Sequence, residues 1–421
     1  MKKFVPLLAL AVAAGVLVLA GTASASGGKP AGALYVSTQG SAGAAGKNCG
    51  TAAFSSIGAA VAAAAEGGTV VVCPGTYTED VIVQKALTLT GQNATIDATG
   101  LENAIQVVAS DVSVSGFTLE NANGEGLLVG IDSFADAGLL PPTGPVLSDV
   151  TIDNVKAIND DKGFNGTEEG NCKYPGDCGG GIHLNVVANS TVSNSRVVGN
   201  ADGILLTDDY GPNHDNLVVG NYVADNKTEC GIVLPSHSTD AVNFVVNDDG
   251  SMTVTGRNPD LGGVYDNVVR DNVAIDNGTA QAPPQFGGGG SGSGIGIFGS
   301  GPGAGAYDNL VEDNYMAGNG LAGFTIHAHH PGGSDVNGNQ IVNNTFDTNN
   351  LFGDGFDGGV TDFQTTAIAV YSVPPADLTI SGNKIRNNSI GIWLTDTVDA
   401  LGLDTNQYAH VGTPVVTEPA N

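Results

Sequence analysis

Hydrophobic and polar residues alternate in short runs along most of this chain, as in Val81–Val83 and Leu87–Leu89. Short alternating runs bounded by Gly, Asn or Asp are typical of β-strands. One segment differs, because Phe54–Ala65 is rich in alanine and places Ile57 and Val61 on a single face. The pattern predicts an all-β protein with one helix near its N-terminus.

From about residue 180 the chain repeats a Gly-Ile-x-Leu element, first at Gly181–Leu184 and again 22 residues later at Gly203–Leu206. Further copies or related forms are Gly231–Leu234, Gly296–Phe298, Gly323–Ile326, Ala367–Val370 and Gly391–Leu394. Sequence periods of roughly 20–50 residues indicate a solenoid, and short strands without intervening helices make it a β-solenoid.

A second repeated element places asparagine at every fifth position. The triplets are Asn216/Asn221/Asn226, Asn267/Asn272/Asn277, Asn309/Asn314/Asn319 and Asn339/Asn344/Asn349. Asparagine tolerates left-handed backbone and hydrogen-bonds its own backbone at turns. We therefore expect asparagine at the corners of the coils, with stacked amides hydrogen-bonded from coil to coil, as in cross-β ladders.

These features resemble a known family. The stretch from Leu34 through Cys73–Glu79 to Ala94–Asp97 is similar to the start of pectin-lyase-like β-helix proteins. The asparagine-spaced coils resemble the repeat of NosD-like proteins and of many carbohydrate-active enzymes. The resemblance implies a right-handed parallel β-helix with an N-terminal capping helix, the cap lying near residues 49–80. It implies no single activity, because the scaffold carries hydrolases, lyases, epimerases, adhesins and binding proteins.

The N-terminus has the three parts of an export signal: Lys2 and Lys3, an apolar run over Phe4–Ala20, and small residues at Ala23–Ala25. We expect a signal peptide over residues 1–26, then a single β-helix domain over 27–421 with long loops near 238–263 and 279–294. No later stretch reaches the roughly 18–20 apolar residues of a membrane helix. The prediction is a secreted, extracellular protein with no membrane span after signal removal.

The chain is strongly acidic, with 43 Asp and Glu against 14 Lys and Arg and a formal charge of −29. Such a surface repels nucleic acid, which usually requires a basic patch. It also disfavours unaided binding of polyanionic glycans. A neutral polysaccharide, or a divalent cation between the protein and an acidic polysaccharide, fits better. The sequence indicates no other cofactor, and we expect a monomer.

Five cysteines in an exported chain indicate disulfides plus one odd thiol. Cys49 with Cys73 would tie the cap to the first strands. Cys172 with Cys178 would close a loop, and Cys230 would then be the odd thiol.

Strand alternation assigns the side chains to faces. The Ile and Leu of each Gly-Ile-x-Leu element point inward, so the x residue and every second residue after it point outward. The outward row predicted in this way is His183, Asn185, Leu205, Thr207, Asp209, Val233, His237, Phe298, Ser300, Thr325, His327, His329, Tyr371, Trp393 and Thr395. Coils stack about 4.8 Å apart, so Asp209 and His237 are expected as neighbours. His329 would lie about two coils further along.

The outward row and the two long loops predict a cleft suited to an extended polymer. The predicted catalytic residues are Asp208, Asp209, His214, His237, His327 and His329, and the predicted substrate-binding residues are His183, Tyr210, Tyr371 and Trp393. A carboxylate such as Asp209 would act as acid or base, or orient His237. The alternative is that these are ordinary surface residues, with the Asp208–Asp209 pair capping a turn.

Three chemistries remain open. Hydrolysis needs two carboxyl groups across the scissile bond; the Asp208–Asp209 pair resembles polygalacturonase-type hydrolases, whose Gly-His-Gly and Arg-Ile-Lys elements are missing here. Elimination or epimerisation needs a base next to the sugar carboxylate. The segment Tyr210–Asn216 is similar to a mannuronan C5-epimerase signature, although it is one residue shorter. His327 and His329 also have a spacing suited to a transition metal.

The sequence therefore predicts a secreted enzyme, either a glycoside hydrolase or a polysaccharide lyase or epimerase, acting on an extracellular polysaccharide. The alternative is a non-catalytic, NosD-like β-helix that binds glycan or metal.

Overall fold

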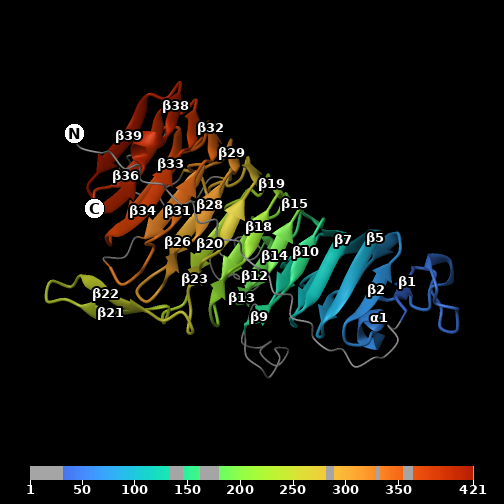
Figure 1. Cartoon of the computed structure of the whole chain (residues 1–421). Helices are drawn as coiled ribbons and strands as arrows, with labels where there is room; N and C mark the ends of the chain where they lie inside the picture. The colour runs from blue at the N-terminus through green and yellow to red at the C-terminus, as the bar shows by residue number, and fades with distance from the viewer. Residues whose placement is uncertain are drawn as a thin grey trace, which may run out of the picture. The chain divides into compact units, whose positions relative to one another are not determined.

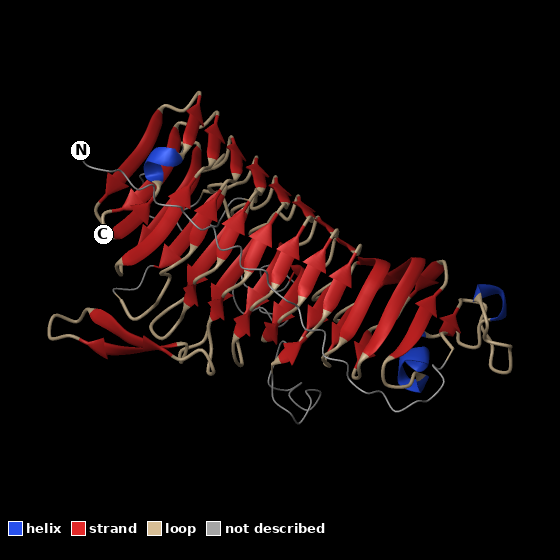
Figure 2. Ribbon diagram, viewed as in Figure 1, coloured by secondary structure: helices blue, strands red, loops and turns tan. Residues whose placement is uncertain are grey.

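Short strands in parallel register build a right-handed parallel β-helix (Figure 1). The computed structural model describes residues 32–131, 146–161, 180–280, 289–328, 332–353 and 364–420. The predicted export signal lies outside these residues. Figure 2 shows how strands dominate the fold and how few helical turns accompany them. The fold class expected from the repeats is confirmed.

The first sheet has eleven strands, one for each successive coil. They are β4 (Val81–Val83), β6 (Ile105–Val107), β8 (Leu127–Val129), β12 (Gly180–Asn185), β16 (Asp202–Thr207), β20 (Ile232–Ser236), β26 (Ile295–Gly299), β30 (Phe324–Ala328), β33 (Thr366–Ser372), β36 (Ile390–Thr395) and β39 (Thr413–Glu418). The Gly-Ile-x-Leu elements lie in this sheet. Their Ile and Leu side chains, such as Ile204 and Leu206, are fully buried in the core, as predicted.

The second sheet has 21 strands. The asparagines of the five-residue repeat lie at the corners beside its short strands. Its strands are β1 (Leu34–Val36), β2 (Gly68–Val72), β3 (Gly75–Tyr77), β5 (Leu87–Asp97), β7 (Val112–Glu120), β10 (Thr151–Asp153), β11 (Lys156–Ile158), β14 (Thr191–Ser193), β15 (Arg196–Val198), β18 (Leu217–Val219), β19 (Tyr222–Ala224), β24 (Val268–Arg270), β25 (Val273–Ile275), β28 (Leu310–Glu312), β29 (Tyr315–Ala317), β31 (Gln340–Val342), β32 (Thr345–Asp347), β34 (Ala376–Ser381), β35 (Lys384–Arg386), β37 (Val398–Leu401) and β38 (Gln407–Ala409). From β10 onward each coil contributes two short strands with a sharp corner between them.

The third sheet is small and follows the first along each coil. It contains β9 (Leu147–Ser148), β13 (Val187–Ala188), β17 (Asn213–His214), β23 (Val264–Tyr265) and β27 (Ala306–Tyr307). An antiparallel hairpin of β21 (Val242–Val246) and β22 (Met252–Arg257) occupies the predicted loop 238–263 and extends away from the stacked coils (Figure 1). Of the predicted loop 279–294, residues 281–288 lie outside the described residues.

Stacked asparagine amides join the coils, as the five-residue spacing predicted. In one ladder Asn221 donates its Nδ2–H to Asn272 Oδ1 at 3.0 Å, and Asn272 donates to Asn314 at the same distance. The ladder continues through Asn344 and Asn383 to Asn406. Parallel ladders begin at Asn216 and at Asn200. Each amide oxygen also accepts a backbone N–H from the preceding coil, so these buried polar groups are satisfied.

The residue before many of these asparagines turns the corner. Asp215, Asp266 and Asp308 have φ of 55°, 53° and 55°, the left-handed region that Asp and Asn tolerate better than most residues. Because β17, β23 and β27 pair in register, these three aspartates stack one per coil. The repeat therefore places like charges in a line along a corner.

Helix α1 spans Ile57–Ala63, shorter at each end than the predicted segment 54–65. Ser56 caps it by accepting the N–H of Ala59, while Phe54 is already bridged to Val36. The carboxylate of Glu79 accepts the hydroxyl of Ser56 and two backbone N–H groups of the first turn. The start of the helix is thereby tied to the coils. Short 3-10 helices at Cys49–Thr51 and Leu403–Thr405 are the other helical elements of the described residues.

The predicted disulfide between Cys49 and Cys73 is present. Cys172 and Cys178 lie outside the described residues. Cys230 is a buried thiol packed with Leu205 and Val233, and burial holds the pKa of that thiol well above its usual range. Within the described ranges, no helix has the length and apolar character needed to cross a membrane.

Candidate functional site

Asp209 and His237 form a hydrogen-bonded pair on neighbouring coils, as the repeat register predicted. His237 Nδ1 lies 2.7 Å from Asp209 Oδ1. Asp209 follows β16 and His237 follows β20, and the two strands pair in parallel. The side chains keep 28% and 21% of their accessible surface, so both are open to solvent in part. A carboxylate hydrogen-bonded to an imidazole is a common acid–base arrangement in enzymes.

The second carboxylate oxygen of Asp209 faces the preceding coil. Oδ2 accepts the Asn185 Nδ2–H at 2.7 Å and the Thr207 hydroxyl at 3.2 Å. Burial raises the pKa of the Asp209 carboxyl. The hydrogen bond and charge of His237, the charge of His183 and the Thr207 hydroxyl outweigh burial, so the net pKa is lowered. Asp209 is therefore a carboxylate held in its charged form by neighbours on both sides.

Asp208 points the opposite way and is fully buried. It accepts hydrogen bonds from the Ser236 hydroxyl at 2.7 Å and from the backbone N–H groups of His237, Ser238 and Gly263 at 2.6, 3.2 and 2.6 Å. Burial raises the pKa of this carboxyl, against the effect of the hydrogen bonds. This position favours a structural role for Asp208, and its catalytic role stays a prediction. Adjacent strand residues face opposite sides, and the inward one closes the base of the hairpin insertion.

A buried hydrogen-bond chain leads to Asp209 from the N-terminal side. His183 Nδ1 lies 3.1 Å from Glu125 Oε1, and its Nε2 lies 2.8 Å from Thr207 Oγ1. Glu125, His183 and Thr207 are 4%, 6% and 1% exposed. Sequence reasoning placed Thr207 and Asn185 in the row without assigning them a role. It missed Glu125, which precedes the regular repeats and carries no sequence signal.

The remainder of the predicted row is in register but largely shielded. Phe298, His327 and Tyr371 align on successive strands, and His327 stacks on Phe298 with ring centroids 5.2 Å apart. His327 is only 7% exposed. His329 lies outside the described residues.

Tyr371 and Trp393 are not the surface platform that the alternation predicted. Trp393 is 2% exposed, and Tyr371 stacks against it at 6.3 Å. Both pack in a small apolar cluster with Ala369 and Ile390. Alternation gives the direction of a side chain relative to its coil, and it does not reveal what covers that side chain.

His214 lies on the third sheet, where it does not join Asp209 and His237 through any hydrogen bond recorded among the described residues. Its Nδ1 is 2.8 Å from Asp215 Oδ2, and its ring stacks on Tyr265 at 4.9 Å. Tyr265 in turn stacks on Tyr307. Tyr210 follows Asp209 in the turn and is partly buried.

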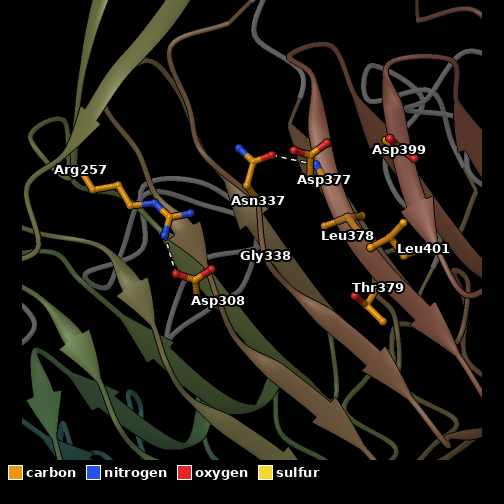
Figure 3. Close-up of a pocket in the computed structure, with 9 residues that line it drawn as sticks. All are labelled: Arg257, Asp308, Asn337, Gly338, Asp377, Leu378, Thr379, Asp399 and Leu401. Carbon is orange, nitrogen blue, oxygen red and sulfur yellow. Dashed lines mark hydrogen bonds and ion pairs between the residues drawn. The ribbon is translucent and has the colours of Figure 1, made fainter.

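A separate hollow opens beside the third sheet, between the hairpin and the C-terminal coils (Figure 3). Arg257 reaches into it from β22 and is ion-paired with Asp308, while Asn337 Oδ1 accepts the backbone N–H of Asp377. Leu401 forms part of its far wall. None of the predicted site residues lines this hollow. Among the described residues, no group of three or more His, Cys, Asp or Glu side chains is arranged to hold a metal ion.

Solved structures with the same architecture include two carbohydrate-active proteins. The A-module of the mannuronan C-5 epimerase AlgE4 from Azotobacter vinelandii matches with a TM-score of 0.54 and 14% identity, over 87% of this chain and 95% of that one. The pectate lyase Pel9A matches with a TM-score of 0.54 and 15% identity, over 88% of this chain and 79% of that one. No protein-family model matches the sequence, and no curated protein matches it either. At such identities the likeness establishes the pectin-lyase-like β-helix fold.

Proposed function

We propose that this pectin-lyase-like β-helix is a secreted enzyme that processes an extracellular polysaccharide by proton transfer, with His237 and Asp209 as its reactive pair. The observation that carries the proposal is the 2.7 Å hydrogen bond between His237 Nδ1 and Asp209 Oδ1, in two side chains that remain partly exposed. In the described part of the row, this pair combines a base with an orienting carboxylate. Both side chains keep part of their surface exposed, although the His237 Nε2 atom itself is buried.

The geometry supports a separate role for each side chain of the pair. Since Nδ1 is hydrogen-bonded to the Asp209 carboxylate, we assign proton exchange with the sugar to Nε2. That atom is buried in this structure, so neighbouring side chains must move before a sugar reaches it. A carboxylate at Nδ1 fixes the orientation of the ring and stabilises the imidazolium that forms when Nε2 takes up a proton. His237 is then the base, and Asp209 orients it.

The surroundings of Asp208 favour elimination or epimerisation over hydrolysis by two carboxylates. Hydrolysis of that kind needs a second carboxyl group roughly 5–9.5 Å from the first, across the bond. Asp208 is buried and held by four donors, so it does not supply that group. Abstraction of the proton beside a sugar carboxylate needs only one positioned base together with neutralisation of the substrate charge.

The acidic surface agrees with a cation-assisted reaction. At a formal charge of −29, an acidic polysaccharide binds best with a divalent cation between its carboxylates and the protein. The structural likeness to an epimerase module and a pectate lyase supports the same substrate class. The predicted export signal and the Cys49–Cys73 disulfide support a location outside the cytoplasm, where disulfides persist.

The test is an activity screen of the secreted protein on acidic and neutral polysaccharides, with calcium or with a chelator. Elimination gives products with ultraviolet absorbance from the new double bond, and epimerisation changes the sugar proton NMR spectrum. Asp209→Asn and His237→Ala should each lower the rate by about 10²–10⁴-fold. New reducing ends without a double bond, from a neutral polymer, would contradict the proposal and support a hydrolase.

The shielding of the row favours a second candidate, a β-helix that binds a glycan without turning it over. His183, His327 and Trp393 are all less than a tenth exposed, which leaves a short open stretch around His237. This candidate predicts glycan binding by calorimetry that persists in Asp209→Asn, with no product formed by the wild-type protein on any polymer of the screen.

A further inference from the structure

A line of hydrogen bonds runs across the coils that contain β8, β12, β16 and β20 of the first sheet and ends at the reactive pair. It runs from Glu125 through His183 and Thr207 to Asp209, and from there to His237. Its first three members are nearly inaccessible to solvent. Low local polarity strengthens each hydrogen bond and makes an unmade one costly, so such a chain acts as a unit.

The direction of these hydrogen bonds follows from the protons available. Thr207 has one hydroxyl proton, and Asp209, with its lowered pKa, is an acceptor, so the hydroxyl donates to Asp209 Oδ2. The hydroxyl oxygen must then accept from His183, which places a proton on Nε2. A proton also lies between His183 Nδ1 and Glu125 Oε1, because two bare lone pairs would repel each other at 3.1 Å.

From this arrangement we infer that Glu125, His183 and Thr207 form an internal proton relay that serves the Asp209–His237 pair. In the relay step, His183 Nε2–H passes to Thr207 Oγ1 as the Thr207 hydroxyl proton passes to Asp209 Oδ2. An imidazolium and a carboxylate become a neutral imidazole and a carboxylic acid, and Thr207 ends as a hydroxyl again. The reverse step returns the proton.

The relay rests on the proposed function, and it explains why a polar chain is buried beside the pair. Glu125, His183 and Thr207 touch no substrate, so they are positioning residues that act through Asp209. Because Glu125 is itself buried, the relay holds one proton for the pair inside the protein, away from the polysaccharide-binding side. A purely structural chain needs only hydrogen bonds between its members. The relay also needs a proton that each member can pass on, so proton transfer stops when the hydroxyl at position 207 is lost.

The deciding comparison is Thr207→Val against Thr207→Ser. Valine keeps the shape and removes the hydroxyl, whereas serine restores it. We expect Thr207→Val to lower kcat at least about tenfold with KM little changed, and Thr207→Ser to recover most of the rate. In mixtures of light and heavy water, the rate of the wild-type protein should depend non-linearly on deuterium content, and that of Thr207→Val linearly.

Thr325→Val is the matched control. Thr325 is a buried threonine of the same sheet, and its hydroxyl is hydrogen-bonded to Ser293. It is not part of the hydrogen-bond chain from Glu125 to His237. It should retain wild-type kinetics. Glu125→Gln should reproduce the loss seen in Thr207→Val, and the double variant should lose no more than either single one, because one route is interrupted once.

A measurement that needs no substrate separates the relay from the proposed function. Carbon-13 NMR of the Asp209 carboxyl should show a higher pKa in Thr207→Val, because a hydrogen bond to the charged form is lost, and the wild-type pKa in Thr207→Ser. An unchanged Asp209 titration and unchanged kinetics in Thr207→Val would overturn the relay. If Asp209→Asn and His237→Ala abolish turnover in that case, the proposed function stands without it.

Discussion

Asp208 and Asp209 hold His237 at two different atoms. Asp208 accepts the backbone N–H of His237, and Asp209 accepts the ring Nδ1–H. The two carboxylates point to opposite faces, because successive strand residues do so. One is therefore part of the framework and the other part of the reactive pair, although they are neighbours in the sequence.

Opposite effects are expected when each of these aspartates is changed to asparagine. Asp208→Asn replaces one carboxylate oxygen, the acceptor of two of its four hydrogen bonds, with an amide NH2. Unfolding in urea should show a loss of several kcal/mol, since each buried donor left unpaired costs about 1–3 kcal/mol. Asp209→Asn should lower the melting temperature much less than Asp208→Asn does, while losing turnover. Equal melting temperatures for the two variants would show that Asp208 is not structural.

The lowered pKa of Asp209 predicts how stability depends on pH. A carboxyl whose pKa is lower in the folded than in the unfolded protein contributes stability above the unfolded value, and that contribution is lost as pH falls through the folded value. Melting temperatures of wild type and Asp209→Asn, measured from neutral pH down to strongly acidic pH, should therefore converge on the acidic side. A constant difference across this range would contradict the lowered pKa.

At the scale of single residues, the sequence predicted the Asp209–His237 pair but not the side chains that surround it. Asp209 and His237 could be brought together from the repeat register alone. Trp393 could not be placed correctly, because the covering side chains come from other coils. Glu125 lies before the regular repeats, where no register connects it with His183.

The asparagine ladders are the elements that join one coil to the next. Asn314 lies in the middle of a ladder, where it donates to Asn344 and to the carbonyl of Val269 and accepts two hydrogen bonds from Asn272. All of these groups are buried or in strands, so water replaces none of them easily.

Asn314→Ala should therefore destabilise the protein by about 2–4 kcal/mol, because at least two buried groups lose their partner at about 1–3 kcal/mol each. Asn406→Ala, at the last position of the same ladder, is the matched comparison, because Asn406 also accepts two hydrogen bonds from Asn383 and donates to backbone carbonyls. No further amide follows it, so this variant should cost less if the hydrogen bonds of the ladder strengthen one another. The free energy of unfolding in urea measures both. A similar cost at the two positions would mean that the ladder adds nothing beyond its separate hydrogen bonds.

Most elements were predictable because each repeats. The five-residue spacing located the corners, and the Gly-Ile-x-Leu motif located the first sheet. The sequence placed the end of helix α1 too late, because alanine continues to Ala65. The helix ends at Ala63, and the backbone at Ala64 is already extended. The hairpin β21–β22 was predicted only as a long loop, because it occurs once. Among the described residues its two strands pair with each other, and Met252 alone bridges to another coil.

Across the stack of coils, the repeat concentrates negative charge. Asp215, Asp266 and Asp308 stand at equivalent corners of successive coils, and burial together with the charges of Asp215 and Asp308 raises the pKa of Asp266. Rows of this kind oppose the compact state, because like charges are brought close together.

Salt should therefore stabilise this protein. Raising the ionic strength from about 0.01 M to 0.15 M shortens the screening length from about 30 Å to about 8 Å, so repulsion along the aspartate rows weakens. We expect the melting temperature to rise over this range, and to rise less in Asp266→Asn. A fall in melting temperature with salt would indicate that attractive ion pairs outweigh the rows.

At the scale of the chain, the sequence predicted architecture better than activity. Fold follows from periodicities that recur in every coil, whereas the reactive pair depends on a few side chains in two coils. The predicted single domain and export signal stay predictions, and the disulfide at Cys49–Cys73 is confirmed.

The hairpin insertion enters and leaves its coil at one point. Its first residue, Ser238, and its last, Gly263, donate their backbone N–H groups to the same Asp208 carboxylate. A segment anchored in this way can vary in length and sequence while its two ends keep their attachment, except where Arg257 pairs with Asp308 and Asp335 and where Met252 bridges Gly332. Replacement of residues 239–262 would therefore change this edge of the molecule, and leave the coils that carry Asp209 and His237 as they are, if those contacts with later coils are kept.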